Sequence, residues 1–110
     1  MSYDVSLSLK VEDVPELVNL KDTWLNITFN VSEMIEAACN LNINSWNGNR
    51  ASDVLPNLRE GYSELVYHAD KYKQYEAPNG WGTVPDTANF LKSMITNCEE
   101  YPFAYIIVEK

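Results

Sequence analysis

Neutral hydrogen-bonding side chains follow one another on one face of the segment 24–32, whose sequence is WLNITFNVS. One side of this alternating segment is apolar and holds Leu25, Ile27, Phe29 and Val31. The other side is polar or aromatic and holds Trp24, Asn26, Thr28 and Asn30. Uncharged amides and hydroxyls beside an indole can hold a neutral polar ligand, whereas acid–base catalysis needs titrating groups.

The same amides and hydroxyls have a structural alternative. Asn and Thr side chains readily bond nearby backbone groups, and the loop 78–82 offers such groups. If the row instead lines a ligand site, we expect it to face Asn79 and Trp81 of that loop. We favour the structural role.

Groups that could catalyse a reaction are few. His68 is the only histidine, near the end of an expected long helix, so we expect it to face solvent or to interact with the helix C-terminus. Glu60 and Glu64 lie one helical turn apart, which is the spacing of a solvated helix face as well as of a cation site. Cys39 and Cys98 fall on apolar helical stripes, so we expect inert, buried thiols. With no glycine-rich phosphate motif either, we predict no catalytic residue, no metal and no cofactor.

Aromatic residues offer a different function, namely binding. Four tyrosines occur between residues 62 and 75, and Trp81 follows in a glycine-flanked loop. Packing at the edge of the core explains most of them, but exposed members would be anchors of a protein interface. Tyr62 and Tyr75 are the candidates among these tyrosines.

The charge balance restricts the partner. Sixteen acidic and eight basic residues give a net charge of -8, so the clustered Lys and Arg of a nucleic-acid-binding surface are absent. Scattered carboxylates can serve solubility alone, or they can be presented to a basic groove on another protein. No apolar run approaches the roughly 18 residues of a membrane span, and the N-terminus lacks the features of a signal peptide. We therefore expect an intracellular, cytoplasmic protein without direct contact to nucleic acid or membrane.

Hydrophobic periodicity predicts the elements. Strict alternation indicates strands at 3–11 and 24–31, joined by a loop at 12–23 that has room for one extra short extended piece. Helical stripes indicate a short helix N-capped by Ser32, a long helix over 51–72 and a third helix from 84 to about 101; the loops 40–50 and 77–82 separate them. The segment 103–108 is apolar at both its odd and its even positions, so both faces would be covered. It is predicted as a strand in the middle of the sheet.

Two details of the helices have structural meaning. Gly61 weakens the long helix by about 1 kcal/mol relative to Ala, and we expect it to mark a close contact. Thr83 and Asp86 are spaced as a capping box. The whole chain, 1–110, is predicted to be one α+β domain with a small, mainly antiparallel sheet of about three strands and three helices, in the order β-β-α-α-α-β.

Four blocks of the sequence resemble a family of short phage, prophage and bacterial proteins. The blocks lie at 26–34 (NITFNVSEM), 51–58 (ASDVLPNL), 75–82 (YEAPNGWG) and 102–108 (PFAYIIV), so the resemblance covers about residues 24–108. The matching residues are Asn26, Thr28, Asn30, Ser32, Met34, Pro56, Asn79, Gly80, Trp81 and Gly82. The segment 40–50 departs from the pattern.

This resemblance implies no particular reaction. It implies a phage accessory protein, of the kind that acts in counter-defence or host takeover by stoichiometric binding to a host protein, in the host cytoplasm. The leading hypothesis is therefore a non-enzymatic inhibitor. The alternatives are a small-ligand binder that sequesters a nucleotide-derived signal at the Asn row and Trp81, a virion structural component, and an enzyme that uses His68 or the carboxylates.

Overall fold

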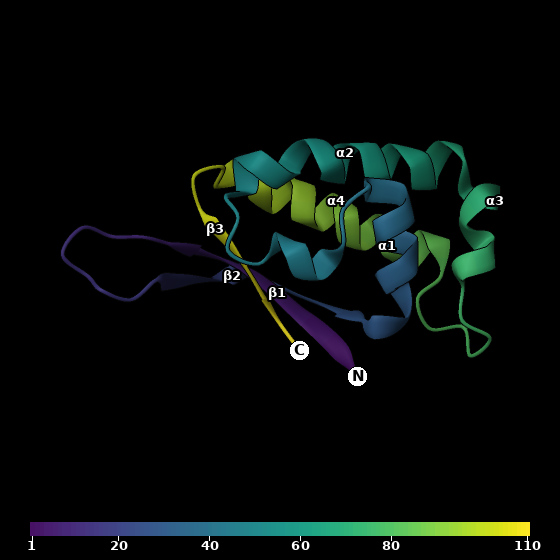
Figure 1. Cartoon of the computed structure of the whole chain (residues 1–110), viewed down its shortest axis with the longest axis horizontal. Coiled ribbons are helices and arrows are strands. Elements are labelled where there is room, and N and C mark those ends of the chain that lie inside the picture. The colour runs from purple at the N-terminus through teal and green to yellow at the C-terminus, as the bar shows by residue number, and fades with distance from the viewer.

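The computed structural model describes all 110 residues and shows an α+β fold. Three antiparallel strands form the sheet in the order β2-β1-β3, with β1 at Ser2–Leu9, β2 at Val18–Thr28 and β3 at Tyr105–Glu109. The helices gather on one side of it (Figure 1) and are α1 at Ser32–Cys39, α2 at Ala51–Tyr67, α3 at Ala69–Tyr72 and α4 at Val84–Glu100. The predicted fold class is confirmed, with four helices instead of three.

One continuous core joins the sheet to the helices. Twenty-four buried hydrophobic residues form a single cluster. Its fully buried members come from the central strand and from every long helix, and include Leu7, Met34, Leu58, Leu91 and Met94. The apolar stripes that identified the helices in the sequence are therefore the faces that meet in this core.

The extra helix arises because the predicted helix 51–72 breaks at His68. The backbone of His68 leaves helical geometry, with φ -130° and ψ 39°, while its N–H still bonds the carbonyl oxygen of Glu64 at 2.9 Å. α3 then continues in a new direction. At the start of α4 the capping box is confirmed, because Thr83 Oγ1 accepts a bond from the Asp86 N–H at 3.2 Å and Asp86 Oδ2 accepts one from the Thr83 N–H at 3.4 Å.

The second strand differs from its prediction at both ends. It begins at Val18, inside the predicted loop 12–23, because its pairing with β1 jumps from Val5 opposite Leu25 to Leu7 opposite Leu20. Residues 21–24 bulge at this jump, and a bulge breaks the alternation by which a strand is recognised in a sequence. Within the bulge, Thr23 Oγ1 accepts a bond from the Leu7 N–H at 2.8 Å and donates to the Leu20 carbonyl at 2.6 Å.

The prediction of Ser32 as a helix N-cap is wrong. β2 ends at Thr28, and a 3₁₀ turn, η1 at Phe29–Val31, precedes α1, so the N-cap position of the helix belongs to Val31. Ser32 Oγ instead donates to the Phe29 carbonyl at 2.7 Å and lies 2.8 Å from the Tyr3 hydroxyl. Thr28 is the residue that caps the turn, since its Oγ1 accepts a bond from the Asn30 N–H at 3.3 Å. The chain turns three residues earlier than the alternation indicated.

The predicted position of the last strand is also wrong, since β3 lies at the edge of the sheet and β1 lies in the middle. Its outer edge is covered by the segment 47–50: Gly48 N–H donates to the Ile106 carbonyl and Ile106 N–H to the Asn49 carbonyl, both at 2.8 Å. The predicted loop 40–50 thus acts as an irregular edge partner. It also contains the short helix η2, Ile43–Trp46, whose Ile43 and Trp46 are fully buried. The segment pairs with the backbone of β3, while among the β3 side chains only that of Ile106 is buried.

None of the helices combines the length and the apolar character needed to cross a membrane.

Candidate functional site

The polar row of β2 divides into two groups in the structure. Asn30 Nδ2 donates to the Trp81 carbonyl at 3.3 Å and lies 3.5 Å from Asn79 Oδ1, which in turn accepts a bond from the Trp81 N–H at 2.9 Å. Thr28 lies at the same junction, against Gly82. These residues therefore join the end of β2 to the loop 79–82, as the structural interpretation predicts for Asn30.

Asn26 does not reach that loop. Its Nδ2 group bonds the start of β1, with acceptors at Ser2 Oγ (2.9 Å), the Tyr3 carbonyl (3.2 Å) and Asp4 Oδ1 (2.8 Å). Trp24, at the bulge of β2, and Trp81, in the loop 79–82, are both largely exposed, and neither lines a cavity, so the indoles and amides do not enclose one common pocket.

The two tyrosine candidates lie elsewhere. Tyr62 is half-buried against the core, and the ring of Tyr75 is tilted against that of Tyr72 with the centroids 6.3 Å apart. None of the eight candidate residues lines any of the four cavities of the molecule.

The titratable groups around His68 form a structural corner between α2 and α3. Tyr72 OH donates to Glu64 Oε1 at 2.6 Å, Lys71 Nζ lies 3.5 Å from the same oxygen, and exposed His68 lies 3.7 Å from Glu64 Oε2. The hydrogen bond from Tyr72 lowers the pKa of Glu64, and the nearby Lys71 and His68 lower it further. Burial, together with the bond to Glu64, raises the pKa of Tyr72 to about 12. The carboxylate is thus held ionised by its neighbours.

Both cysteines are free, fully buried thiols, as predicted. Burial raises the pKa of each to about 12, with a smaller contribution from Glu60 at Cys39 and from Glu99 at Cys98. A thiol with such a pKa is a poor nucleophile because the thiolate is the reactive form. The structure also contains no group of three or more His, Cys, Asp or Glu side chains placed to share a metal ion.

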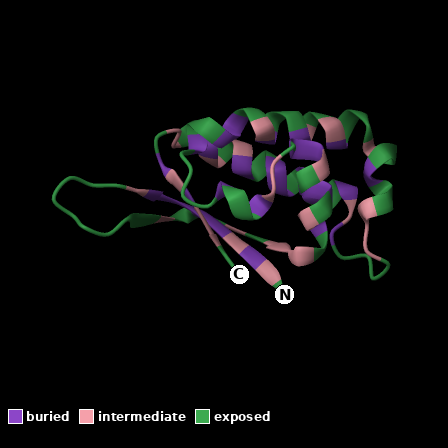
Figure 2. Cartoon of the chain, viewed as in Figure 1, coloured by how far each residue is buried: buried purple, intermediate pink, exposed green.

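The most prominent surface feature is the connection between β1 and β2. We call residues 10–18 the arm: the β1–β2 connection together with Val18, the first residue of β2. The arm projects beyond the rest of the molecule (Figure 1), and the connection, residues 10–17, is exposed throughout (Figure 2). Four aliphatic side chains on it are 42–45% exposed, those of Val11, Val14, Leu17 and Val18. Such residues usually lie in a core, so their exposure together on one projection is unusual.

The tip of the arm has a defined turn. The Val14 N–H donates to the Val11 carbonyl at 3.1 Å, and Asp13, the third residue of this turn, has a φ of +65°. Asp tolerates the left-handed region better than most residues because its short side chain can bond locally. The turn therefore places the carboxylates of Glu12 and Asp13 at its corner.

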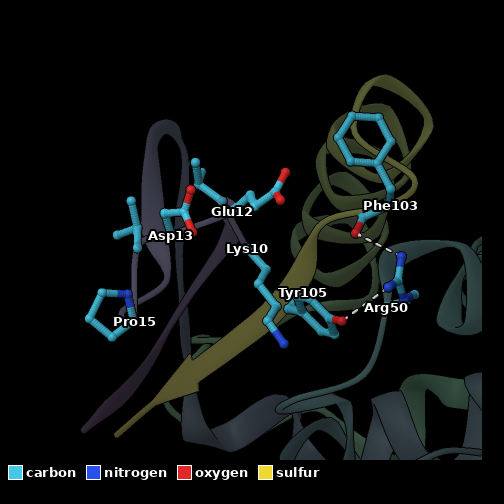
Figure 3. A pocket seen from close by; sticks show the side chains of 9 residues that line it. Lys10, Glu12, Asp13, Pro15, Arg50, Phe103 and Tyr105 are labelled. Carbon is cyan, nitrogen blue, oxygen red and sulfur yellow. Dashed lines mark hydrogen bonds between the residues drawn. The ribbon is translucent and has the colours of Figure 1, made fainter.

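A groove separates the arm from the body of the protein. It has a volume of about 700 Å³ and is lined by arm residues 10–15 on one wall and by Arg50, Phe103 and Tyr105 on the other (Figure 3). Arg50 builds the second wall: it donates to the Phe103 carbonyl at 3.4 Å and to the Tyr105 hydroxyl at 3.1 Å, and its guanidinium carbon lies 5.0 Å from the centre of the Tyr105 ring. Phe103 is 57% exposed beside it. We call this cavity the arm groove.

The arm and its groove were not predicted as a site. The sequence places residues 12–17 in a connecting loop, although aliphatic residues every third position in such a loop are a usable signal. The contribution of Arg50 and Phe103 could not be read from the sequence, because 53 positions separate them and only the β3 pairing brings them together.

Comparison of the chain with protein-family models, with curated protein sequences and with solved structures finds no match.

Proposed function

We propose that this protein is a non-enzymatic binding protein that acts by stoichiometric association with another protein, and that the arm is its contact surface. One observation carries the proposal. Of the ten large hydrophobic residues that are exposed, five lie on the arm or on the facing wall of its groove: Val11, Val14, Leu17, Val18 and Phe103. Exposed hydrophobic residues that gather on one part of the surface are characteristic of interaction sites.

The gain from covering this surface is sufficient to matter. Completing the burial of a partly exposed Val or Leu contributes about 1 kcal/mol, so four such side chains and a phenyl ring together supply several kcal/mol. A projecting hairpin also reaches into a concave partner surface more easily than a flat face does. Association through the arm is therefore energetically reasonable for a partner with a cleft.

The nature of the partner follows from the resemblance described above, and we propose a protein of a host cell, inhibited by a phage-encoded accessory protein. In this proposal the resembling blocks supply the scaffold, since Asn30, Asn79 and Gly82 hold β2 to the loop before α4. The arm lies outside residues 24–108, where the resemblance is found. The contact surface would then be a feature of this chain in particular.

Affinity capture from host lysate tests the proposal with a matched pair of variants. Because Leu9 is paired with Val18, replacing residues 10–17 by Asn-Gly closes the hairpin with a two-residue turn and removes most of the arm. We expect the full chain to retain one partner in a fixed ratio and the shortened chain to lose it. The variant Val66→Ala, which shortens a similarly exposed aliphatic residue of α2 outside the arm and its groove, is the control and should retain the partner. Equal capture by the full and shortened chains, or no stoichiometric partner at low and moderate salt, would contradict the proposal.

A small-ligand binder is the second candidate, and the observation that favours it is the arm groove, whose volume lies in the range of small-molecule sites. A ligand would lie between Tyr105 and the arm, away from the Asn row. Thermal-shift screening of nucleotides and related signals would detect it as a raised melting temperature that the shortened chain does not show.

A further inference from the structure

We infer that the arm binds a cleft that carries apolar and basic groups together, with Lys or Arg side chains of the partner protein pairing with Glu12, Asp13 and Glu16. The inference rests on the proposed function and specifies the chemistry of the partner.

The arm carries charge that the protein itself leaves unpaired. Within residues 10–17, one lysine and three carboxylates give a charge of -2. All four ion pairs of the protein lie on helices or at helix ends, between residues 59 and 99, and none includes an arm carboxylate. The side chains of Glu12, Asp13 and Glu16 also make no hydrogen bond to the body. They are free for an external cation.

Two basic residues line the groove, Lys10 and Arg50, and neither forms an ion pair with these carboxylates. Arg50 directs its guanidinium group to the Tyr105 hydroxyl and the Phe103 carbonyl, so it serves as part of the wall. In Figure 3, Glu12 and Asp13 lie on the arm wall, and Phe103 lies across the groove from them. A cationic side chain that enters between the two walls would meet carboxylates on one side and an aromatic face on the other, which is a favourable combination for Lys or Arg.

Acidic and aliphatic residues alternate along the arm, which matches the basic and the apolar groups of the inferred cleft. Its carboxylates alternate with Val11, Val14 and Leu17, so acidic and aliphatic groups occur together on one short hairpin. The aliphatic groups would contact the apolar part of the cleft while the carboxylates, two of them at the corner of the tip turn, meet its basic groups. Such charge pairs guide association and determine specificity.

A second copy of this chain is disfavoured as the occupant. Each copy carries a net charge of -8, and a two-fold contact between arms would oppose two surfaces of charge -2. Like charges across an interface cost free energy, whereas a basic partner is attracted by the same field.

Nuclear magnetic resonance titration with synthetic peptides tests the inference without the natural partner. The probe is a soluble peptide of about ten residues in which Leu alternates with Arg, and the matched peptides carry Gln or Glu in place of Arg. We expect the Arg peptide to shift amide signals of residues 10–18 and 103–105, and its affinity to fall as salt rises from about 50 to about 300 mM. The Gln and Glu peptides should bind at least about tenfold more weakly.

Charge variants complete the experiment. The triple variant Glu12→Gln/Asp13→Asn/Glu16→Gln should lose about tenfold or more in affinity for the Arg peptide, whereas Glu33→Gln/Glu36→Gln/Glu109→Gln, which changes the net charge equally at distant exposed positions, should lose much less. Equal loss in both variants, or equal binding of the Gln peptide on the arm, would overturn the basic character of the partner while leaving the arm as contact surface. Arm shifts that depend on protein concentration without peptide would identify a second copy as the occupant. No arm shift with any peptide would also overturn the inference, and the capture experiment with the shortened chain decides the proposed function independently.

Discussion

Gly61 of α2 lies so close to Cys39 of α1 that a Cβ atom at position 61 would overlap the Cys39 sulfur. α1 and α2 are in direct contact at this point. Both residues are buried, and the Cys39 side chain is completely enclosed. The expectation that Gly61 marks a close contact is thereby confirmed.

Replacing Gly61 by Ala should destabilise the protein despite the better helix propensity of Ala. Overpacking costs about 1–3 kcal/mol and helix propensity returns about 1 kcal/mol at most, so we expect a net loss of up to about 2 kcal/mol in the free energy of unfolding, measured in urea. In the double variant Cys39→Ala/Gly61→Ala the sulfur is gone, and the loss due to Gly61→Ala should shrink or vanish. Additive effects of the two substitutions would show that the contact is not responsible.

Two glycines in the loop before α4 allow the cost of backbone strain to be measured separately from the cost of steric overlap. Gly80 and Gly82 both have positive φ, +77° and +89°, but a Cβ at Gly80 has open space, whereas one at Gly82 would lie 2.7 Å from Val31 Cγ1. Gly80→Ala should therefore cost only the strain of the left-handed backbone, about 1–2 kcal/mol, and Gly82→Ala should cost about 1–3 kcal/mol more. Urea unfolding of the two variants measures the difference. Equal losses would mean that the junction between Val31 and Gly82 is looser than the structure shows.

At the bulge between β1 and β2, the hydroxyl of Thr23 takes the place of a backbone carbonyl as the acceptor for the Leu7 N–H. This role can be tested. Thr23→Val keeps the shape but leaves the Leu7 N–H without its acceptor in a buried place, so we expect a loss of about 2–3 kcal/mol. Thr23→Ser keeps the hydroxyl and should cost about 1 kcal/mol. Unfolding free energies, together with faster hydrogen exchange of the Leu7 amide in the Val variant, provide the measurement. A Val variant as stable as the Ser variant would be the contrary result.

The interactions of Glu64 with Tyr72, Lys71 and His68 predict that the stability of the protein depends on pH. The pKa of Glu64 is lowered from its ordinary value of 4.5, above all by the hydrogen bond from Tyr72. A carboxyl whose folded pKa is depressed contributes stability above the unfolded pKa and loses it as the pH falls through the folded pKa. Tyr72→Phe should raise the Glu64 pKa toward 4.5 and make the stability less sensitive to pH in the acidic range below it.

Carboxyl-carbon magnetic resonance of Glu64 measures this shift directly, and unfolding at several acidic pH values measures its effect. The control is Tyr75→Phe, which alters the neighbouring ring without removing a bond to Glu64. If both variants moved the Glu64 pKa alike, the hydrogen bond would not be its cause.

The sequence by itself determined what depends on local periodicity and on burial along one element. Alternation in 3–11 identified the strand that became β1, helical stripes identified α1, α2 and α4, and the Thr83–Asp86 spacing identified a cap that the structure contains. The inert thiols followed in the same way, because a cysteine on an apolar stripe faces the core. These features depend on neighbours within a few residues, so the sequence expresses them directly.

Only the tertiary structure decided which segments lie beside one another. The order β2-β1-β3, the cover of β3 by residues 47–50 and the bulge at Thr23 all depend on pairings between distant residues. The same is true of the polar row: Asn30 bonds the loop at 79–81 while Asn26, four residues earlier, bonds β1. The alternation in 24–31 predicted both amides on one face but carried no information about the hydrogen-bond partner of each, and Asn30 lies in η1, beyond the end of β2.

The candidate site shows the same division. The sequence contains the acidic and aliphatic residues of the arm, yet it indicates only a loop. Whether a segment is exposed depends on which other elements pack against it, and this is decided by the fold. The groove needs Arg50 and Phe103 as well, and these approach the arm only when β3 returns beside β1. Burial along one element can be read locally, whereas a surface is formed by elements that the folded chain brings together.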